Sequence, residues 1–269
     1  MDNEDRIIKS FSKYAKSYDR HAQLQKNMAE RLASMLPEKF PDCVTELGCG
    51  TGLFTRHLLA QPVRQLIIND ISPGMMDQLQ ENITLPQNTK LIVGNAGKVE
   101  FVSTDLIAAN AVFQWFADPR KTLNHLVKYI NSGGLLIFST FGPGTLKEFR
   151  ETACMESPAT LFSHKQWRTM IQQAGFTLNE SHIELRKSFF PGTRALIRNL
   201  QQIGAAPFPL LKSGGLRKLI REYDENFSTE QGVYVTWELL YFSAVRPLRG
   251  RKSGANTRFA HEPRKAMNP

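Results

Sequence analysis

Three glycines at alternate positions follow a short apolar strand and precede a helix-forming segment, and this feature constrains the chain most. The run reads Val44-Thr45-Glu46-Leu47-Gly48-Cys49-Gly50-Thr51-Gly52-Leu53-Phe54. Glycine lacks a Cβ, so it adopts positive φ and lets a ligand approach the backbone where a strand meets a helix N-terminus. We therefore predict that this turn binds a cofactor, with Gly48, Gly50 and Gly52 as contacts.

The residues around these glycines favour one class of cofactor. A dinucleotide turn needs G-x-G-x-x-G, whose third glycine allows close packing of the helix on the strand, but Leu53 stands at that position. Glu46, at the end of the strand, would repel a pyrophosphate and would attract the cationic amino-acid end of S-adenosylmethionine. The charge therefore favours S-adenosylmethionine, with Glu46 as a further contact.

A second strand, predicted over Gln65 to Asp70, ends in an acid about 20 residues after the glycines. A carboxylate can accept hydrogen bonds from both ribose hydroxyls, so Asp70 is predicted to bind the ribose. Separately, the glycines could form only a tight turn and Asp70 could simply cap the next helix. Together they favour a nucleoside cofactor.

Composition suggests one large α/β domain, although two domains remain possible for 269 residues of which 41% are hydrophobic. The net charge is +9, and residues 246 to 269 carry +6 of it. We predict that 246–269 is a basic disordered tail after a single domain spanning 1–245. The tail has no interleaved aromatic residues, so we expect a solvated extension rather than a nucleic-acid-binding arm.

Three cysteines without a C-x-x-C pair are typical of a reducing compartment. The acidic start lacks an apolar signal region, and no apolar run approaches the ~20 residues of a membrane span. The six histidines include no H-x-x-x-H pair. We therefore expect a cytoplasmic protein with no metal site and no membrane or nucleic-acid partner.

Strand and helix signals alternate through the middle of the chain, which predicts a doubly wound, mostly parallel sheet with helices on both faces. After 185, a short strand and a later long strand flank a helical segment, which predicts an antiparallel hairpin carrying a helical lid. Residues 1–36 are predicted to form a helical cover and 191–230 the lid. The predicted elements are helices beginning at Ser72, at Asp118 (ending at 132–134) and at Ser163, helices over 193–203 and 213–227, and strands over 89–93, 105–112, 135–141, 186–190 and 233–245.

The chain resembles class I S-adenosylmethionine-dependent methyltransferases, and more closely the malonyl-acyl-carrier-protein O-methyltransferases of biotin synthesis. Besides the glycine loop, the resemblance rests on three segments and covers roughly residues 5 to 246. The segments are Phe11-Ser12-Lys13-Tyr14-Ala15-Lys16-Ser17-Tyr18-Asp19-Arg20-His21-Ala22, Asn110-Ala111-Val112-Phe113-Gln114-Trp115 and Arg198-Asn199-Leu200-Gln201-Gln202-Ile203-Gly204-Ala205. The resemblance implies a seven-stranded sheet of this fold.

The resemblance also implies cofactor contacts. Glu46 and the glycines would hold the amino-acid end, Asp70 the ribose, and Asn110 would lie near the methyl group. The family's usual acid beside the adenine is absent, and Asn95 occupies that position. An amide can still bond the exocyclic amine, but more weakly than a carboxylate.

The implied reaction methylates the free carboxylate of malonyl-acyl-carrier protein, giving the ester that primes pimeloyl and biotin synthesis. Such a carboxylate is already ionised and needs no general base. Tyr18 and Arg198 are the candidate catalytic residues that would hold it. Helical spacing alone would place Tyr18 in a packing stripe with Phe11. It would place Arg198 on a solvent-exposed face.

Two other functions are compatible with the same residues. One is a methyltransferase acting on a small molecule such as a quinone precursor, and the other is an assembly factor of this fold that transfers no methyl group. The intact glycine loop with Asp70 favours an active enzyme. Acyl chain length, carrier preference, oligomeric state and the role of the tail are left open by the sequence.

Overall fold

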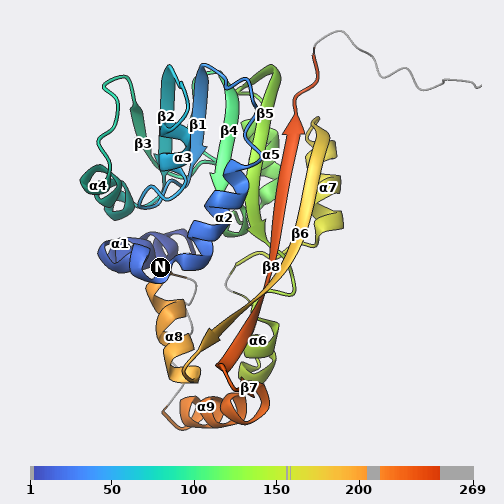
Figure 1. The fold of residues 1–269 in the computed structure, drawn as a ribbon. Helices are drawn as coiled ribbons and strands as arrows, with labels where there is room; N and C mark the ends of the chain where they lie inside the picture. The colour runs from blue at the N-terminus through green and yellow to red at the C-terminus, as the bar shows by residue number, and fades with distance from the viewer. Residues whose placement is uncertain (1–2, 156, 158, 205–212, 249–269) are drawn as a thin grey trace, which may run out of the picture.

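A single twisted sheet organises the computed structural model, which describes residues 3–155, 157, 159–204 and 213–248. Seven strands lie in the order β3-β2-β1-β4-β5-β8-β6, and the short β7 pairs with β8 (Figure 1). The strands are β1 (Cys43–Leu47), β2 (Gln65–Asp70), β3 (Lys90–Val93), β4 (Thr104–Asn110), β5 (Ile130–Phe141), β6 (Thr177–Phe190), β7 (Ser228–Thr229) and β8 (Gly232–Val245).

Strands β1 to β5 pair in parallel, and β8 runs antiparallel between β5 and β6. The predicted α/β fold with a mostly parallel seven-stranded sheet is confirmed, with β7 as an additional two-residue strand. The helices are α1 (Asn3–His21), α2 (Gln23–Ala33), α3 (Thr55–Leu59), α4 (Pro73–Asn82), the 3-10 turn η1 (Phe113–Trp115), α5 (Pro119–Leu126), α6 (Lys147–Ala153), α7 (His164–Gln173), α8 (Thr193–Gln202) and α9 (Ser213–Phe227).

Alternate residues of the parallel strands enter two separate hydrophobic cores, as expected of a sheet covered on both faces. In β2, Leu66 and Ile68 pack in the core that contains Met28 of α2. Ile67 packs in the other core, with Leu123 of α5. The carboxyl ends of β1 to β4 are left at one edge of the sheet, where α1 lies across them (Figure 1).

Local capping signals correctly marked two helix starts. The Ser72 hydroxyl accepts the backbone N–H of Met75 at the start of α4, with Pro73 in the first turn. Ser163 and Gln166 form the predicted capping box of α7. These contacts involve neighbours in sequence, which explains why spacing alone could find them.

The prediction for the helix that begins near Asp118 was wrong at its end. That helix was expected to continue to 132–134, but α5 ends at Leu126, and Ile130 begins β5. Ile130 pairs with Thr104 of β4 and is fully buried. Its spacing from Leu126 fits either a helix or a buried strand, and pairing with β4 decided between them.

The late strands form the predicted antiparallel hairpin. Strands β6 and β8 pair from Thr177↔Val245 to Phe190↔Val233. Their ribbon extends past the carboxyl ends of the parallel strands, where α6, α8, α9 and β7 gather around it (Figure 1). Helix α8 contacts both α1 and α9. The hairpin therefore carries helices to the same edge of the sheet as the glycine loop.

Among the helices that the structure describes, none is long and apolar enough to cross a membrane. The predicted tail falls almost entirely on 249–269, outside the described residues.

Candidate active site

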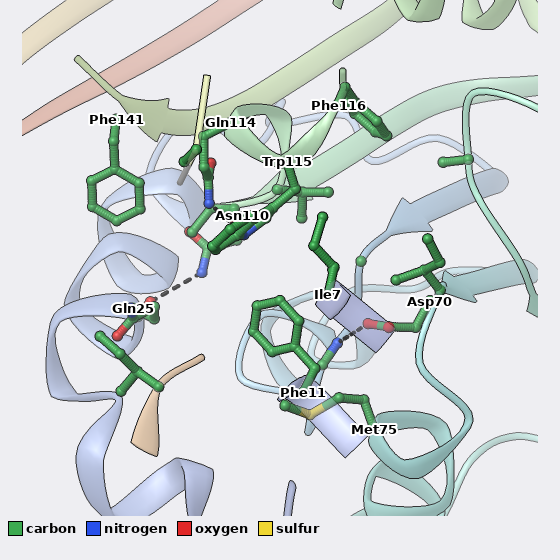
Figure 2. A pocket seen from close by; sticks show the side chains of 18 of the residues that line it. Ile7, Phe11, Gln25, Asp70, Met75, Asn110, Gln114, Trp115, Phe116 and Phe141 are labelled. Atoms are coloured by element: carbon green, nitrogen blue, oxygen red, sulfur yellow. Dashed lines mark hydrogen bonds between the residues drawn. The ribbon is translucent and has the colours of Figure 1, made fainter. Parts of the chain in front are cut away.

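A pocket lies at the carboxyl ends of β1 to β4, beneath α1. It is lined by Gly48 and Gly50 after β1, by Asp70 at the end of β2, and by residues 94–96 after β3. Phe11 and Ile7 of α1 point into it beside Met75, while Asn110 and Gln114 line its other end (Figure 2). The pocket thus joins the predicted cofactor site to a second compartment.

The three glycines of the loop differ in the space around them, as the surroundings of a Cβ placed on each one show. At Gly48 it would lie 2.4 Å from the Val112 side chain, and at Gly52 2.4 Å from the Ile83 side chain. At Gly50 it would meet nothing within 4 Å. All three have positive φ. Gly50 therefore leaves open space for a ligand, whereas Gly48 and Gly52 also allow close packing, and Gly52 does not line the pocket.

Asp70 is held firmly at the pocket wall. Its Oδ2 accepts the Gly50 N–H and its Oδ1 accepts the Ser72 N–H, each at 2.8 Å (Figure 2 shows the first bond). Burial raises the pKa of Asp70 to about 6, although these backbone N–H groups act in the opposite direction. Each oxygen has a second lone pair, so the carboxylate can still accept hydrogen bonds from the hydroxyl groups of a ribose.

Glu46 lies behind the glycine loop instead of in the pocket lining. It is 1% exposed, and its Oε2 has no hydrogen-bond partner among the described residues. Burial, reinforced by the charge of Asp70, raises the pKa of Glu46 to about 8. A buried carboxyl without a partner can accept a hydrogen bond from a donor group, directly or through water. Its contact with the cationic end of the cofactor stays a prediction.

Asn95 lines the pocket after β3, where it was predicted, and it has a partner that the sequence did not reveal. Its Nδ2 donates to Oε2 of Glu4 in α1 at 2.9 Å, and its Oδ1 accepts the Gly97 N–H at 2.8 Å. Lys98 donates to the same Glu4 oxygen at 2.7 Å. Glu4 also lines the pocket. No local pattern links two residues 91 positions apart.

A hydrogen-bond network fixes Asn110 at the far end of the pocket. Its Oδ1 accepts the Ser139 hydroxyl at 2.7 Å, and its Nδ2 donates to the Gln25 carbonyl at 3.0 Å (Figure 2 shows the second bond). Next to it, Ala111 has φ 56°, and its carbonyl accepts the Gln114 amide. Oε1 of Gln25 is buried without a partner among the described residues. Sequence analysis did not identify Gln25.

Tyr18 lines the pocket from α1, where its ring packs beside that of Phe11. The Phe11 ring lies 6.4 Å from that of Tyr18 and 5.5 Å from that of Trp115. Burial, with smaller effects of Asp70 and Asp19, raises the pKa of the Tyr18 phenol, so it stays a hydrogen-bond donor at neutral pH. Tyr18 is therefore both part of the packing stripe and part of the pocket wall.

Arg198 does not reach this pocket. Helix α8 buries Leu196 and Leu200, and Ile203 just beyond it lines the pocket, while the Arg198 side chain is exposed. No Lys, Arg or His is found among the described lining residues. The predicted role of Arg198 at the carboxylate stays untested, and its placement favours the solvent-exposed face that helical spacing indicated.

The comparisons with known proteins agree with this geometry. The methyltransferase domain family matches residues 18–181. The malonyl-acyl-carrier-protein O-methyltransferase of Paenibacillus sp. (strain JDR-2) is 31% identical, with 86% of this chain and 94% of that protein covered. The enzyme of the same name from Brevibacillus brevis is 32% identical, with 89% and 95% covered. This chain belongs to their family.

A solved structure supports the fold separately. The N-methyltransferase NodS from Bradyrhizobium japonicum WM9, in complex with S-adenosyl-L-homocysteine, matches with a TM-score of 0.56. The match covers 90% of this chain and 99% of that one at 13% identity. It shows that both chains have the class I methyltransferase fold.

This methyltransferase uses S-adenosylmethionine, and its own residues fit that group. The open space at Gly50, the two remaining Asp70 lone pairs and the apolar residues Ile7 and Met75 suit a nucleoside. The described residues contain no cluster of three His, Cys, Asp or Glu that could hold a metal ion.

Proposed function

We propose that this methyltransferase transfers a methyl group from S-adenosylmethionine to the free carboxylate of malonyl-acyl-carrier protein, giving the methyl ester that primes biotin synthesis. The supporting observation is the continuous pocket, in which the cofactor-binding end at Gly50 and Asp70 opens into a compartment walled by Tyr18, Trp115 and Asn110. The names of its relatives specify the substrate.

The chemistry makes modest demands on the protein. The sulfonium of the cofactor supplies an electrophilic methyl group, and a malonyl carboxylate is ionised at neutral pH and can attack it. No side chain has to remove a proton, so the protein needs only to align the two groups and exclude water. The absence of histidine from the described pocket lining is compatible with such a reaction.

Neutral donors would hold the carboxylate in this pocket. Among the described lining residues, we propose the phenol of Tyr18 as the hydrogen-bond donor to the carboxylate, because it stays protonated near neutral pH. The rigid amide of Asn110 and the aromatic ring of Trp115 would orient the malonyl group. A weakly polar compartment suits a reaction in which a cation and an anion neutralise each other.

The direct test is methyl transfer from S-adenosylmethionine carrying a labelled methyl group. Malonyl-carrier protein should become labelled as a base-labile ester, whereas acetyl-carrier protein, which has no free carboxylate, should not. Label on a quinone precursor, with none on the malonyl carrier, would replace the proposal with small-molecule methylation. Cofactor binding with no labelled product from either substrate would instead support an assembly factor.

Removing the Tyr18 hydroxyl tests its proposed contact with the carboxylate. Tyr18→Phe should lower kcat/KM for malonyl-carrier protein by roughly 10-fold or more, because one hydrogen bond to a charged group is lost. Affinity for S-adenosylhomocysteine should change by less than about 2-fold. Tyr14→Phe is the matched control, since Tyr14 is on α1 but outside the pocket lining. Unchanged kcat/KM in Tyr18→Phe would assign the residue to packing alone.

A basic surface on α8 and α9 lies where a carrier protein could dock. Its side chains are exposed, and carrier proteins of this pathway are expected to be acidic, so attraction would guide the acyl group toward the pocket. We propose that these helices form the lid, and that the α1–α2 segment is the cover of a single domain. The described basic residues are Arg194, Arg198, Arg217, Lys218 and Arg221; Lys212 lies outside the described residues.

Charge reversal at Arg198 distinguishes docking from a clamp on the carboxylate. Arg198→Glu should raise KM for malonyl-carrier protein by about 3- to 10-fold at low salt and much less at high salt. A malonyl thioester without the protein should be unaffected. Lys165→Glu makes the same charge change on α7, outside this surface. Equal losses with both substrates at every salt concentration would support the clamp instead.

The three cysteines, Cys43, Cys49 and Cys154, are all unpaired. We propose a cytoplasmic location, since this is the compartment in which free thiols persist. Fractionation of the producing cell would test it.

A further inference from the structure

The wall of the pocket beyond Asp70 combines an apolar slot with a polar edge. Ile7 of α1, Ile71 and Met75 line the slot, and Glu4 and Asn95 line the pocket beside the loop that follows β3. A flat purine needs apolar contacts on its faces and hydrogen-bonding groups at its edge. This part of the pocket therefore has the chemistry expected of an adenine site.

We propose that Glu4, on the first turn of α1, accepts the exocyclic amine of the cofactor's adenine and sets the preference for that base. Asn95 alone would provide only a neutral amide at this edge. Glu4 brings a carboxylate to it from α1, 91 positions away in the sequence, at 2.9 Å from the Asn95 amide nitrogen. The adenine edge would thus be recognised by a pair of residues, one from α1 and one from the sheet.

The contacts of Asn95 determine which hydrogen-bonding groups this edge of the pocket offers to a base. Its Nδ2 faces Glu4 and its Oδ1 faces the Gly97 N–H, so the amide orientation is determined by partners on both sides. The remaining lone pair of Oδ1 and the carboxylate of Glu4 are acceptors. An edge rich in acceptors favours an amine at position 6 of the purine and disfavours a carbonyl oxygen there.

The ion pair with Lys98 does not by itself explain the position of Glu4. The Lys98 side chain is 70% exposed, and such surface pairs contribute little to stability. Glu4 is only 33% exposed and lines the pocket. Lys98 instead donates to the Glu4 carboxylate and helps to direct it toward Asn95, which makes Lys98 a positioning residue.

The test compares binding of S-adenosylhomocysteine with that of S-inosylhomocysteine, which carries oxygen in place of the amine. Calorimetry on the wild type should show a preference for the adenosyl ligand of about 10-fold or more. Glu4→Ala should weaken adenosyl binding by roughly 5- to 20-fold while changing inosyl binding far less. Glu4→Gln keeps a neutral acceptor, so its affinity for the adenosyl ligand should lie between those of the wild type and Glu4→Ala.

Two control variants make the result specific. Asp5→Asn removes the same charge from the next residue, which does not line the pocket, and should leave both affinities unchanged. Lys98→Ala should lower the preference for the adenosyl ligand by less than Glu4→Ala does, because Lys98 acts only through Glu4. A thermal melt confirms folding of each variant.

Two results would overturn the proposal. One is an unchanged affinity of Glu4→Ala for S-adenosylhomocysteine. The other is an equal loss for both ligands, which would mean that Glu4 only holds α1 over the pocket. The inference rests on the cofactor and not on the methyl acceptor, so failure to methylate malonyl-carrier protein would leave it standing.

Discussion

Replacing Gly50 with valine should lower the affinity for S-adenosylmethionine by about two orders of magnitude, equivalent to about 2.8 kcal/mol, in a protein that still folds. The Cβ of residue 50 points into open space within the pocket, so the added side chain would occupy cofactor volume without displacing protein atoms. The φ of 54° adds a backbone strain of roughly 1–2 kcal/mol, which a domain of this size tolerates. Calorimetry and a thermal melt measure the two effects separately.

The control is Gly52→Val, which should behave in the opposite way. A Cβ there lies 2.4 Å from Ile83 and 2.6 Å from Leu79, both packed in the core, so the main loss should be in thermal stability. If folded Gly50→Val bound the cofactor with wild-type affinity, the glycine loop would not be the binding site.

Asp70→Asn should weaken S-adenosylmethionine binding by roughly 10- to 100-fold at pH 8, because hydrogen bonds to a charged acceptor are lost. In the wild type, affinity should rise with pH up to about 6 and then level off, since the pKa of Asp70 is raised to about 6 and only the carboxylate accepts on both oxygens. In the asparagine variant this rise should largely disappear. Titration calorimetry between pH 5 and 8, with Asp77→Asn on the adjacent α4 as control, measures it.

The buried carboxyl groups of Asp70 and Glu46 should also make the stability of the protein depend on pH. The pKa values of Asp70 and Glu46 are raised to about 6 and about 8, so between pH 4 and 8 these two groups bind more protons in the folded protein than in the unfolded chain. In the cofactor-free protein, the contribution of these two groups to the free energy of unfolding should therefore fall as pH rises through this range. Asp70→Asn should flatten the lower part of that slope. A pH dependence identical to wild type would show that Asp70 is not the titrating group.

The sequence by itself determined the parts of this protein that depend on local geometry. Positive φ at Gly50, the Ser72 cap of α4 and the strand ending in Asp70 are set by residues within a few positions of one another. The alternation of strand and helix was likewise enough to predict a parallel sheet, because parallel strands require crossover connections. These features together place the cofactor site at the edge of the sheet.

Tertiary structure alone decided the features that join distant segments. Whether Ile130 continued a helix or entered a strand depended on pairing with Thr104, which spacing cannot reveal. Glu4 reached Asn95 only because α1 crosses the carboxyl ends of the strands, whereas the outward direction of Arg198 was already indicated by helical spacing. Hydrogen bonds and packing between segments far apart in the chain have no signature in local spacing, so a pocket assembled from several loops becomes visible only once the chain is folded.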